Sequence, residues 1–194
     1  MKTSARFIFI ILCAGLLVQQ GFSQRTIRMN LERIVSDAAV IVHGTVAAVE
    51  AKRDPGTNII STVVTIRVIE NFYGAAGDSI TLKMAGGRVQ NRSVRFSEMP
   101  VFTPGEEFIG MFYAPSRLGL TSPVGMGQGK FRLIRDPAGT SMIVKNSLNN
   151  AGLFTGMKHA SSLAKSSMLS ASTQGIALDD FTASLRSLIT IVKK

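Results

Sequence analysis

Cysteine is almost absent from this sequence of 194 residues, in which Cys13 is the single example. It lies in the apolar run near the N-terminus, so an exported chain that loses this run has no cysteine at all. Such a chain cannot use a disulfide, a thiolate zinc site or a cysteine nucleophile. Its stability must therefore come from an apolar core.

Histidine is also scarce, with His43 and His159 as the whole supply. Neither stands in the His-x-x-x-His or Glu-x-x-His spacing of a zinc site, and the chain has no Gly-x-Ser-x-Gly elbow for a serine hydrolase. The adjacent Glu106 and Glu107 alternate to opposite faces of a strand, so they cannot converge as glycosidase carboxylates do. We therefore predict no catalytic residue, no metal site and no cofactor.

Three glycines, Gly125, Gly127 and Gly129, precede Lys130 in the stretch SPVGMGQGKFRLIRD and invite comparison with a phosphate-binding loop. A phosphate loop needs its glycines between a strand and the N-terminus of a helix. Here a proline precedes the glycines and a strand-like alternation follows them, and the spacing fits neither the dinucleotide fingerprint nor the P-loop. We predict no nucleotide cofactor and a backbone role for these glycines, either positive torsions or close strand approach.

The N-terminus has the order of a secretory signal peptide. Lys2 and Arg6 precede an apolar run of about 12 residues, which the small-x-small triplet Gly21-Phe22-Ser23 follows, and this run is too short to span a membrane. We predict cleavage after Ser23 and a secreted or periplasmic product without a transmembrane segment. A lipoprotein signal that uses Cys13 and an uncleaved membrane anchor are the alternatives.

Positive charge exceeds negative charge in the mature chain. Loss of Lys2 and Arg6 leaves 20 of the 22 Lys and Arg residues against 12 Asp and Glu, a net charge of about +8. An excess of this kind favours anionic partners such as acidic polysaccharide, lipopolysaccharide or extracellular DNA, and it also keeps a protein soluble. The basic residues are scattered rather than clustered, so both interpretations stay open.

Alternating apolar residues predict a mainly β fold. A short helix that Asn30 caps, with Leu31, Ile34 and Val35 as its apolar stripe and Glu32 facing out, leads into the first strand. Expected strands, with no crossover helix between them, lie within residues 39–53, 60–74, 79–87 and 106–115, and two short strands lie within 129–146 around the turn at residues 136–139. The first two read as a long hairpin around the turn at Asp54-Pro55-Gly56. Five to six short strands without crossovers favour a small antiparallel barrel or sandwich.

The C-terminal part of the chain differs in composition. After Asn146 the sequence is rich in Ser, Ala and Gly and reads as a mobile or loosely packed linker. An amphipathic helix follows, with Asp179 as a possible N-cap, the basic Lys193 and Lys194 at its end, and Phe181, Leu185, Leu188 and Val192 on one stripe. We divide the chain into a signal peptide (1–23), a β-barrel domain (24–147), a linker (148–176) and a C-terminal helix (177–194).

Residues 86–100 are polar and basic, and we expect them to form an irregular connection. Arg88, Arg92 and Arg95 are the best candidates for contact with an anion, and Lys83 of the preceding strand is a fourth. A solvated loop without a ligand is the competing interpretation. His43 is the residue that a hydrolase would have to combine with an acid from another strand.

Four segments together resemble a group of uncharacterised exported bacterial proteins: SDAAVIVHGTVAAVEAKRD, STVVTIRVIENFYGAAGDSITLKMAGG, FTPGEEFIGMFY and GMGQGKFRLIRD. The resemblance covers about residues 36–146. The strand order is also similar to the netrin-like barrel of tissue inhibitors of metalloproteinases. What this implies is a five-stranded, OB-like Greek-key barrel and no particular activity. The short N-terminal helix and the C-terminal amphipathic helix, which the residue pattern predicts, complete the expected fold.

The inhibitor family grips the zinc of its protease through a disulfide-linked N-terminal cysteine, whereas the expected mature chain begins with Gln24-Arg25-Thr26. Inhibition by that chemistry therefore does not carry over. We interpret the protein as a non-enzymatic binding module for an extracellular protein or an anionic polysaccharide. An inhibitor or accessory protein of a co-exported metalloprotease and an extracytoplasmic hydrolase are the alternatives.

Overall fold

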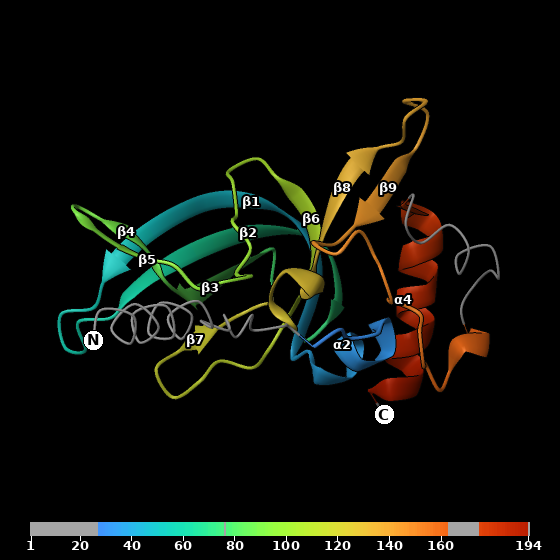
Figure 1. Cartoon of the computed structure of the whole chain (residues 1–194), viewed down its shortest axis with the longest axis horizontal. Helices are drawn as coiled ribbons and strands as arrows, with labels where there is room; N and C mark the ends of the chain where they lie inside the picture. The colour runs from blue at the N-terminus through green and yellow to red at the C-terminus, as the bar shows by residue number, and fades with distance from the viewer. Residues whose placement is uncertain (1–26, 76, 163–174, 194) are drawn as a thin grey trace, which may run out of the picture.

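Strands dominate the computed structural model, which describes residues 27–75, 77–162 and 175–193 (Figure 1). The expected signal peptide lies outside the described residues. In chain order the elements are α2 (Leu31–Asp37), β1 (Val40–Arg53), β2 (Ile60–Tyr73), β3 (Ser79–Ala85), β4 (Gly87–Val89), β5 (Arg92–Val94), β6 (Glu107–Phe112), β7 (Leu120–Thr121), η1 (Met126–Gly129), β8 (Lys130–Arg135), β9 (Met142–Lys145), η2 (Ala160–Ser162), β10 (Ile176–Ala177) and α4 (Leu178–Val192). No helix in this part of the chain is long and apolar enough to cross a membrane.

The long hairpin that the alternating pattern predicts is confirmed. β1 and β2 pair in antiparallel fashion from Ile41 opposite Tyr73 to Arg53 opposite Ile60. At the turn, the Asp54 carboxylate accepts the backbone N–H groups of Gly56 and Thr57. Gly44 lies at an irregularity in the pairing, and a Cβ added there would lie 2.6 Å from Ile66 Cγ2. Glycine is therefore needed at this point because the two strands approach closely.

The sheet is larger than the expected barrel and is not closed. Eight strands follow the order β10-β9-β8-β6-β1-β2-β3-β7, and within the described residues the outer strands β10 and β7 do not pair with each other. The pairing of β3 with β7 is parallel, so the sheet is mixed rather than wholly antiparallel. The prediction of a mainly β fold with two helices is confirmed, whereas the structure does not show an OB barrel of five to six strands.

Two apolar cores lie on the two faces of this sheet. The helix core packs α2 and α4 against one face and includes Ile41, Ile109 and Met111. The strand core lies on the other face, where the curved strands fold over residues that include Val42, Phe108 and Phe112. Because β1 and β6 contribute to both cores, alternate residues of each are buried on opposite faces. The expectation that β6 is a central strand, apolar on both faces, is therefore confirmed.

The C-terminal helix packs on the chain's own core. Phe181, Leu185 and Leu188 are fully buried in the helix core, where α4 stands beside α2 (Figure 1). The expected N-cap was wrong: Ala177 precedes the helix, and Asp179 lies in its first turn. The Lys193 ammonium donates hydrogen bonds to the carbonyl oxygens of Ser36 and Ala38 at the end of α2, and not to carbonyl groups of its own helix. Lys193 at the end of α4 therefore links the two helices through hydrogen bonds.

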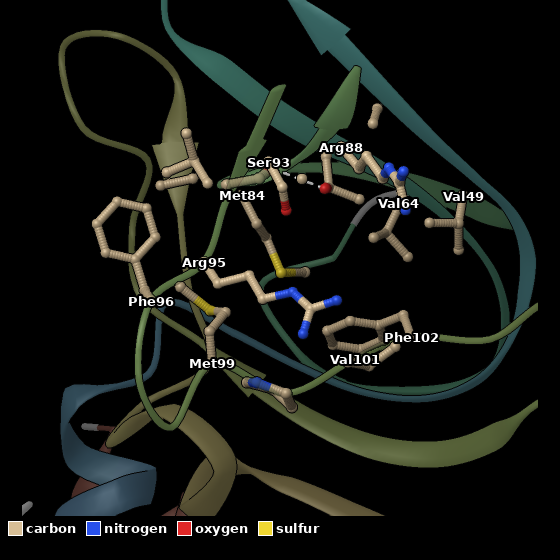
Figure 2. A pocket seen from close by; sticks show the side chains of 17 residues that line it. Val49, Val64, Met84, Arg88, Ser93, Arg95, Phe96, Met99, Val101 and Phe102 are labelled. Carbon is tan, nitrogen blue, oxygen red and sulfur yellow. Dashed lines mark hydrogen bonds between the residues drawn. The ribbon is translucent and has the colours of Figure 1, made fainter. Parts of the chain in front are cut away.

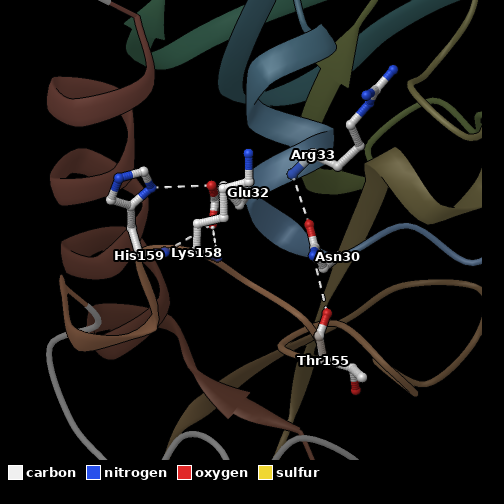
Figure 3. Close-up of polar contacts among 6 residues, drawn as sticks. All are labelled: Asn30, Glu32, Arg33, Thr155, Lys158 and His159. Carbon is white, nitrogen blue, oxygen red and sulfur yellow. Dashed lines mark hydrogen bonds and ion pairs between the residues drawn. The ribbon is translucent and has the colours of Figure 1, made fainter.

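The first half of the expected linker is packed against α2. Leu153 is buried in the helix core, and its carbonyl oxygen accepts the N–H of Leu31 at 2.7 Å. The prediction that Glu32 faces solvent was wrong, because its carboxylate accepts the backbone N–H groups of Lys158 and His159 (Figure 3). These bonds lower the pKa of Glu32, with the His159 N–H as the main cause. Residues 163–174 of the expected linker lie outside the described residues.

The glycine-rich stretch before β8 has the backbone role that its context predicts. Gly125 has φ 61°, a conformation that residues with a side chain rarely adopt. A Cβ on Gly129 would lie 2.5 Å from the carbonyl oxygen of Val124. The glycines thus form the tight 3-10 turn η1 that leads directly into β8.

Candidate functional site

A cleft of about 630 Å³ opens at the end of the strand core (Figure 2). Its floor comes from β1, β2 and β3, and its other side from the segment of residues 86–102. We call it the main cleft; its lining includes Val49, Val64, Met84, Met99 and Phe102. Val64 and Met84 of the floor and Phe102 of the other side are buried in the strand core, so the fold itself holds both sides of the cleft in place.

Two of the four predicted binding residues reach the main cleft. Arg88 and Arg95 both line it, and Figure 2 shows Arg95 extending across the cleft with its guanidinium group toward Phe102. No acidic residue is part of the lining, and within the described residues neither guanidinium group has an ion-pair partner. The main cleft therefore combines an apolar floor with uncompensated positive charge.

The other two predicted residues lie elsewhere. Arg92 lines a second cleft, together with Arg53 and Asn91, and this cleft shares Ala85, Ser93, Val94 and Phe96 with the main cleft. Lys83 forms an ion pair with Asp54 across 3.6 Å, and neither residue lines a described cleft. The structure thus divides the predicted cationic patch, with two arginines in the main cleft, one in the second and the lysine in an ion pair.

The segment that carries the arginines is more regular than expected. Instead of an irregular connection, β4 and β5 form a short antiparallel hairpin, with Arg88 opposite Ser93. The hairpin projects from the end of the long β1–β2 pair (Figure 1). Because it is only three residues long on each side, its alternation is too short to recognise in the sequence.

Apolar side chains at the rim of the main cleft were missed by the sequence reasoning. Val101 is 80% exposed, Phe96 49% and Val94 40%, and all three line the cleft. Exposed apolar surface that gathers around a concave site is typical of a place where a ligand or partner binds. The only sign in the sequence was a few scattered hydrophobic residues within a polar and basic segment, and this sign is weak.

A buried lysine holds one wall of the main cleft. Lys130 is 5% exposed, and its ammonium group donates to the Val101 carbonyl oxygen at 2.6 Å and to the Glu106 carboxylate at 2.7 Å. The same group lies 4.3 Å from the centre of the Phe102 ring. Burial lowers the pKa of Lys130, and the bond to Glu106 opposes that effect. These contacts fix the position of residues 101 and 102 beside the cleft.

His43 does meet an acid from another strand. Its Nε2 lies 2.7 Å from Glu107 Oε1 of β6, while Glu106 points to Lys130, so the two glutamates diverge as their alternation predicts. Neither His43 nor Glu107 lines either cleft. In the part of the chain that the structure describes, no three His, Cys, Asp or Glu side chains gather in a way that could hold a metal ion.

The chemistry that the main cleft offers is binding of an anion with an apolar part. Arginine side chains supply charged N–H donors in a planar fork that suits carboxylate, sulfate and phosphate groups. The floor and rim supply apolar contact.

Comparison of the chain with protein-family models, curated proteins and solved structures gave no match in any of the three. The resemblance to netrin-like barrels therefore stays a prediction.

Proposed function

We propose that the protein is an exported, non-enzymatic binding module whose main cleft takes an anionic ligand that also has an apolar part. One observation carries the proposal: Arg88 and Arg95 line a cleft with an apolar floor and no acidic residue in its lining. The predicted signal peptide supports an extracytoplasmic place of action, and the net positive charge favours an anionic ligand.

Electrostatic reasoning supports an anion over a neutral ligand. Two guanidinium groups without acidic partners repel each other, and a bound anion relieves that repulsion while it gains charge-assisted hydrogen bonds. The exposed apolar rim gains when a ligand removes it from water. A ligand with an anionic group and an apolar part is therefore stabilised both by charge-assisted hydrogen bonds to the arginines and by burial of the apolar rim.

The alternatives that the sequence raised have less support at this site. A protein partner or metalloprotease would use the projecting β4–β5 hairpin, whose β5 residues are all exposed, and this stays a prediction. The hydrolase interpretation needs His43 at a substrate cleft, and His43 lies outside both cleft linings. The OB-like barrel likewise stays a prediction, because the sheet of the described residues is not closed.

The test uses anilinonaphthalene sulfonate, a fluorescent probe with an apolar ring system and one sulfonate. We expect the protein recovered from the extracytoplasmic fraction, beginning at Gln24, to bind it with an affinity that falls as salt rises. The Arg88→Gln/Arg95→Gln variant should bind at least about tenfold more weakly, which is the loss of two charged contacts in a partly exposed site.

A matched control removes the same charge elsewhere. Arg117 and Arg135 are exposed and line neither cleft, so Arg117→Gln/Arg135→Gln should bind the probe as the unchanged protein does. Thermal unfolding followed by circular dichroism shows that each variant is folded. Equal losses in the two double variants would mean that the probe responds to net charge alone, and the proposal would be wrong.

A further inference from the structure

We infer that the ligand of the main cleft is a single-chain alkyl carboxylate, a free fatty acid, whose carboxylate meets Arg95 and Arg88 and whose chain lies along the apolar floor. This inference rests on the proposed function and names its ligand class. Three observations support it: the floor has few free hydrogen-bonding groups, the rim is apolar, and the cleft carries positive charge.

The polar groups of the floor are already used within the protein. Thr62 is the polar side chain on the floor, and its hydroxyl donates to the Gly86 carbonyl oxygen at 2.8 Å. The Gly86 N–H in turn donates to the Ile60 carbonyl oxygen. β2, the middle strand of the floor, pairs with β1 on one side and with β3 on the other, so its backbone groups along the floor are satisfied as well.

A ligand with many polar groups would therefore lose water without compensation. Each sugar hydroxyl or peptide group that enters an apolar site without a new hydrogen bond costs free energy. An alkyl chain carries no such group. The floor thus favours a chain of methylenes over a polysaccharide or an extended peptide.

The rim of the cleft favours the same ligand. Of the nine large hydrophobic residues that are exposed in the described part of the chain, Val94, Phe96 and Val101 line this cleft. Met84 and Met99, whose flexible side chains adapt to irregular apolar shapes, also line it. A volume of about 630 Å³ falls in the usual range for sites that bind small ligands.

The positive charge specifies the head group. Arg95 extends across the cleft toward Phe102 (Figure 2), so a carboxylate that it binds has apolar lining beside it for the alkyl chain. An arginine fork binds a carboxylate through two parallel hydrogen bonds. Charge complementarity therefore selects a fatty acid over an alcohol or an alkyl ammonium ion of the same length.

The experiment observes the methionine methyl groups of the exported protein by nuclear magnetic resonance, at alkyl concentrations below micelle formation. Dodecanoate should shift the Met84 and Met99 signals and leave that of Met142, which lies on β9, in place. Affinity should rise about tenfold for each two methylenes from octanoate to dodecanoate, because each buried methylene contributes about three- to fourfold. Dodecanol should bind at least about tenfold more weakly, and dodecyltrimethylammonium should not bind.

Arg88→Gln/Arg95→Gln should bring the affinity for dodecanoate down to that for dodecanol, whereas Arg117→Gln/Arg135→Gln, which removes the same charge outside both clefts, should leave it unchanged. An acidic peptide with apolar side chains that shifts Met84 and Met99 while dodecanoate does not would overturn the fatty acid and leave the proposed function intact. If the sulfonate probe also fails to bind, both are wrong. Equal binding of dodecanoate and dodecanol would mean an apolar site without anion selection, which contradicts both as well.

Discussion

Lys130 shows how one residue can decide the shape of the main cleft. A lysine that follows three glycines invites comparison with a phosphate ligand, although the sequence around it does not fit a phosphate loop, and the structure buries it against Glu106 and the Phe102 ring. A buried charge needs its partner, because an unpaired charge in an apolar place is costly. The side chain that resembles a ligand therefore acts as a support for the wall of the cleft.

At this scale we predict that Lys130→Met lowers the free energy of unfolding by about 3 kcal/mol, since it leaves the Glu106 carboxylate without its partner. Lys130→Met/Glu106→Gln should cost less than the sum of the two single substitutions, because the double variant leaves no lone charge. Urea unfolding measures all three. Additive losses would show that the ion pair contributes nothing of its own.

Among the elements, α4 buries its apolar stripe against other residues of the same chain. The Phe181 ring lies 4.8 Å from that of Phe131, between their centres, and both rings are buried. The helix is also tied at its surface, where Arg186 forms an ion pair with Glu70 at 2.7 Å. Exposed pairs of this kind contribute little, so burial of the stripe supplies most of the attachment.

The matching prediction is that Phe181→Ala lowers the free energy of unfolding by about 3–5 kcal/mol, as large cavities in a packed core do. Thr190→Ala, at an exposed position of the same helix, should change it by less than about 0.5 kcal/mol. Denaturant unfolding compares the two. Equal stability of both variants would mean that the stripe packs against something other than this core.

For the whole molecule, the carboxyl groups set the response to acid. Glu32, Asp54 and Asp136 lie in three separate parts of the fold, and hydrogen bonds lower the pKa of each. The Thr140 hydroxyl is the main cause for Asp136, whose pKa falls to about 2. A lowered pKa means that the unfolded chain binds protons first as pH falls. These carboxylates therefore contribute their full stabilisation when the pH is above their ordinary pKa values of 4.5 for Glu and 3.8 for Asp. The stabilisation is lost as the pH falls from these values toward the lowered pKa values of the folded protein.

We accordingly predict that the free energy of unfolding falls steadily as the pH drops from about 4.5 to about 2. Glu32→Gln/Asp54→Asn/Asp136→Asn should be less stable at neutral pH and should show a flatter decline over the same range. Urea unfolding at a series of pH values measures both slopes. Parallel curves for the two proteins would assign the acid response to other groups.

Local patterns in the sequence predicted the elements well. The β1–β2 hairpin, the central strand β6, the Asn30 cap of α2 and the buried stripe of α4 each follow from residues close together in the chain. Alternation and helical periodicity depend on neighbouring residues, so a single sequence contains them. The sequence also proposed Arg88 and Arg95 as candidates for anion contact, and both line the main cleft, although it placed them in a loop rather than on or beside a hairpin.

Only the tertiary structure decided what those elements enclose. Whether a sheet closes depends on strand curvature and on distant pairings, such as that of β3 with β7, which no local pattern contains. Likewise Val101 and Phe96 become a cleft rim, and Lys130 a buried support, through contacts with residues far away in the chain. The sequence by itself determined the strands and helices and the excess of positive charge, because these are sums over local residues. Packing between residues far apart in the chain pairs Lys130 with Glu106 and leaves Arg88 and Arg95 in the main cleft.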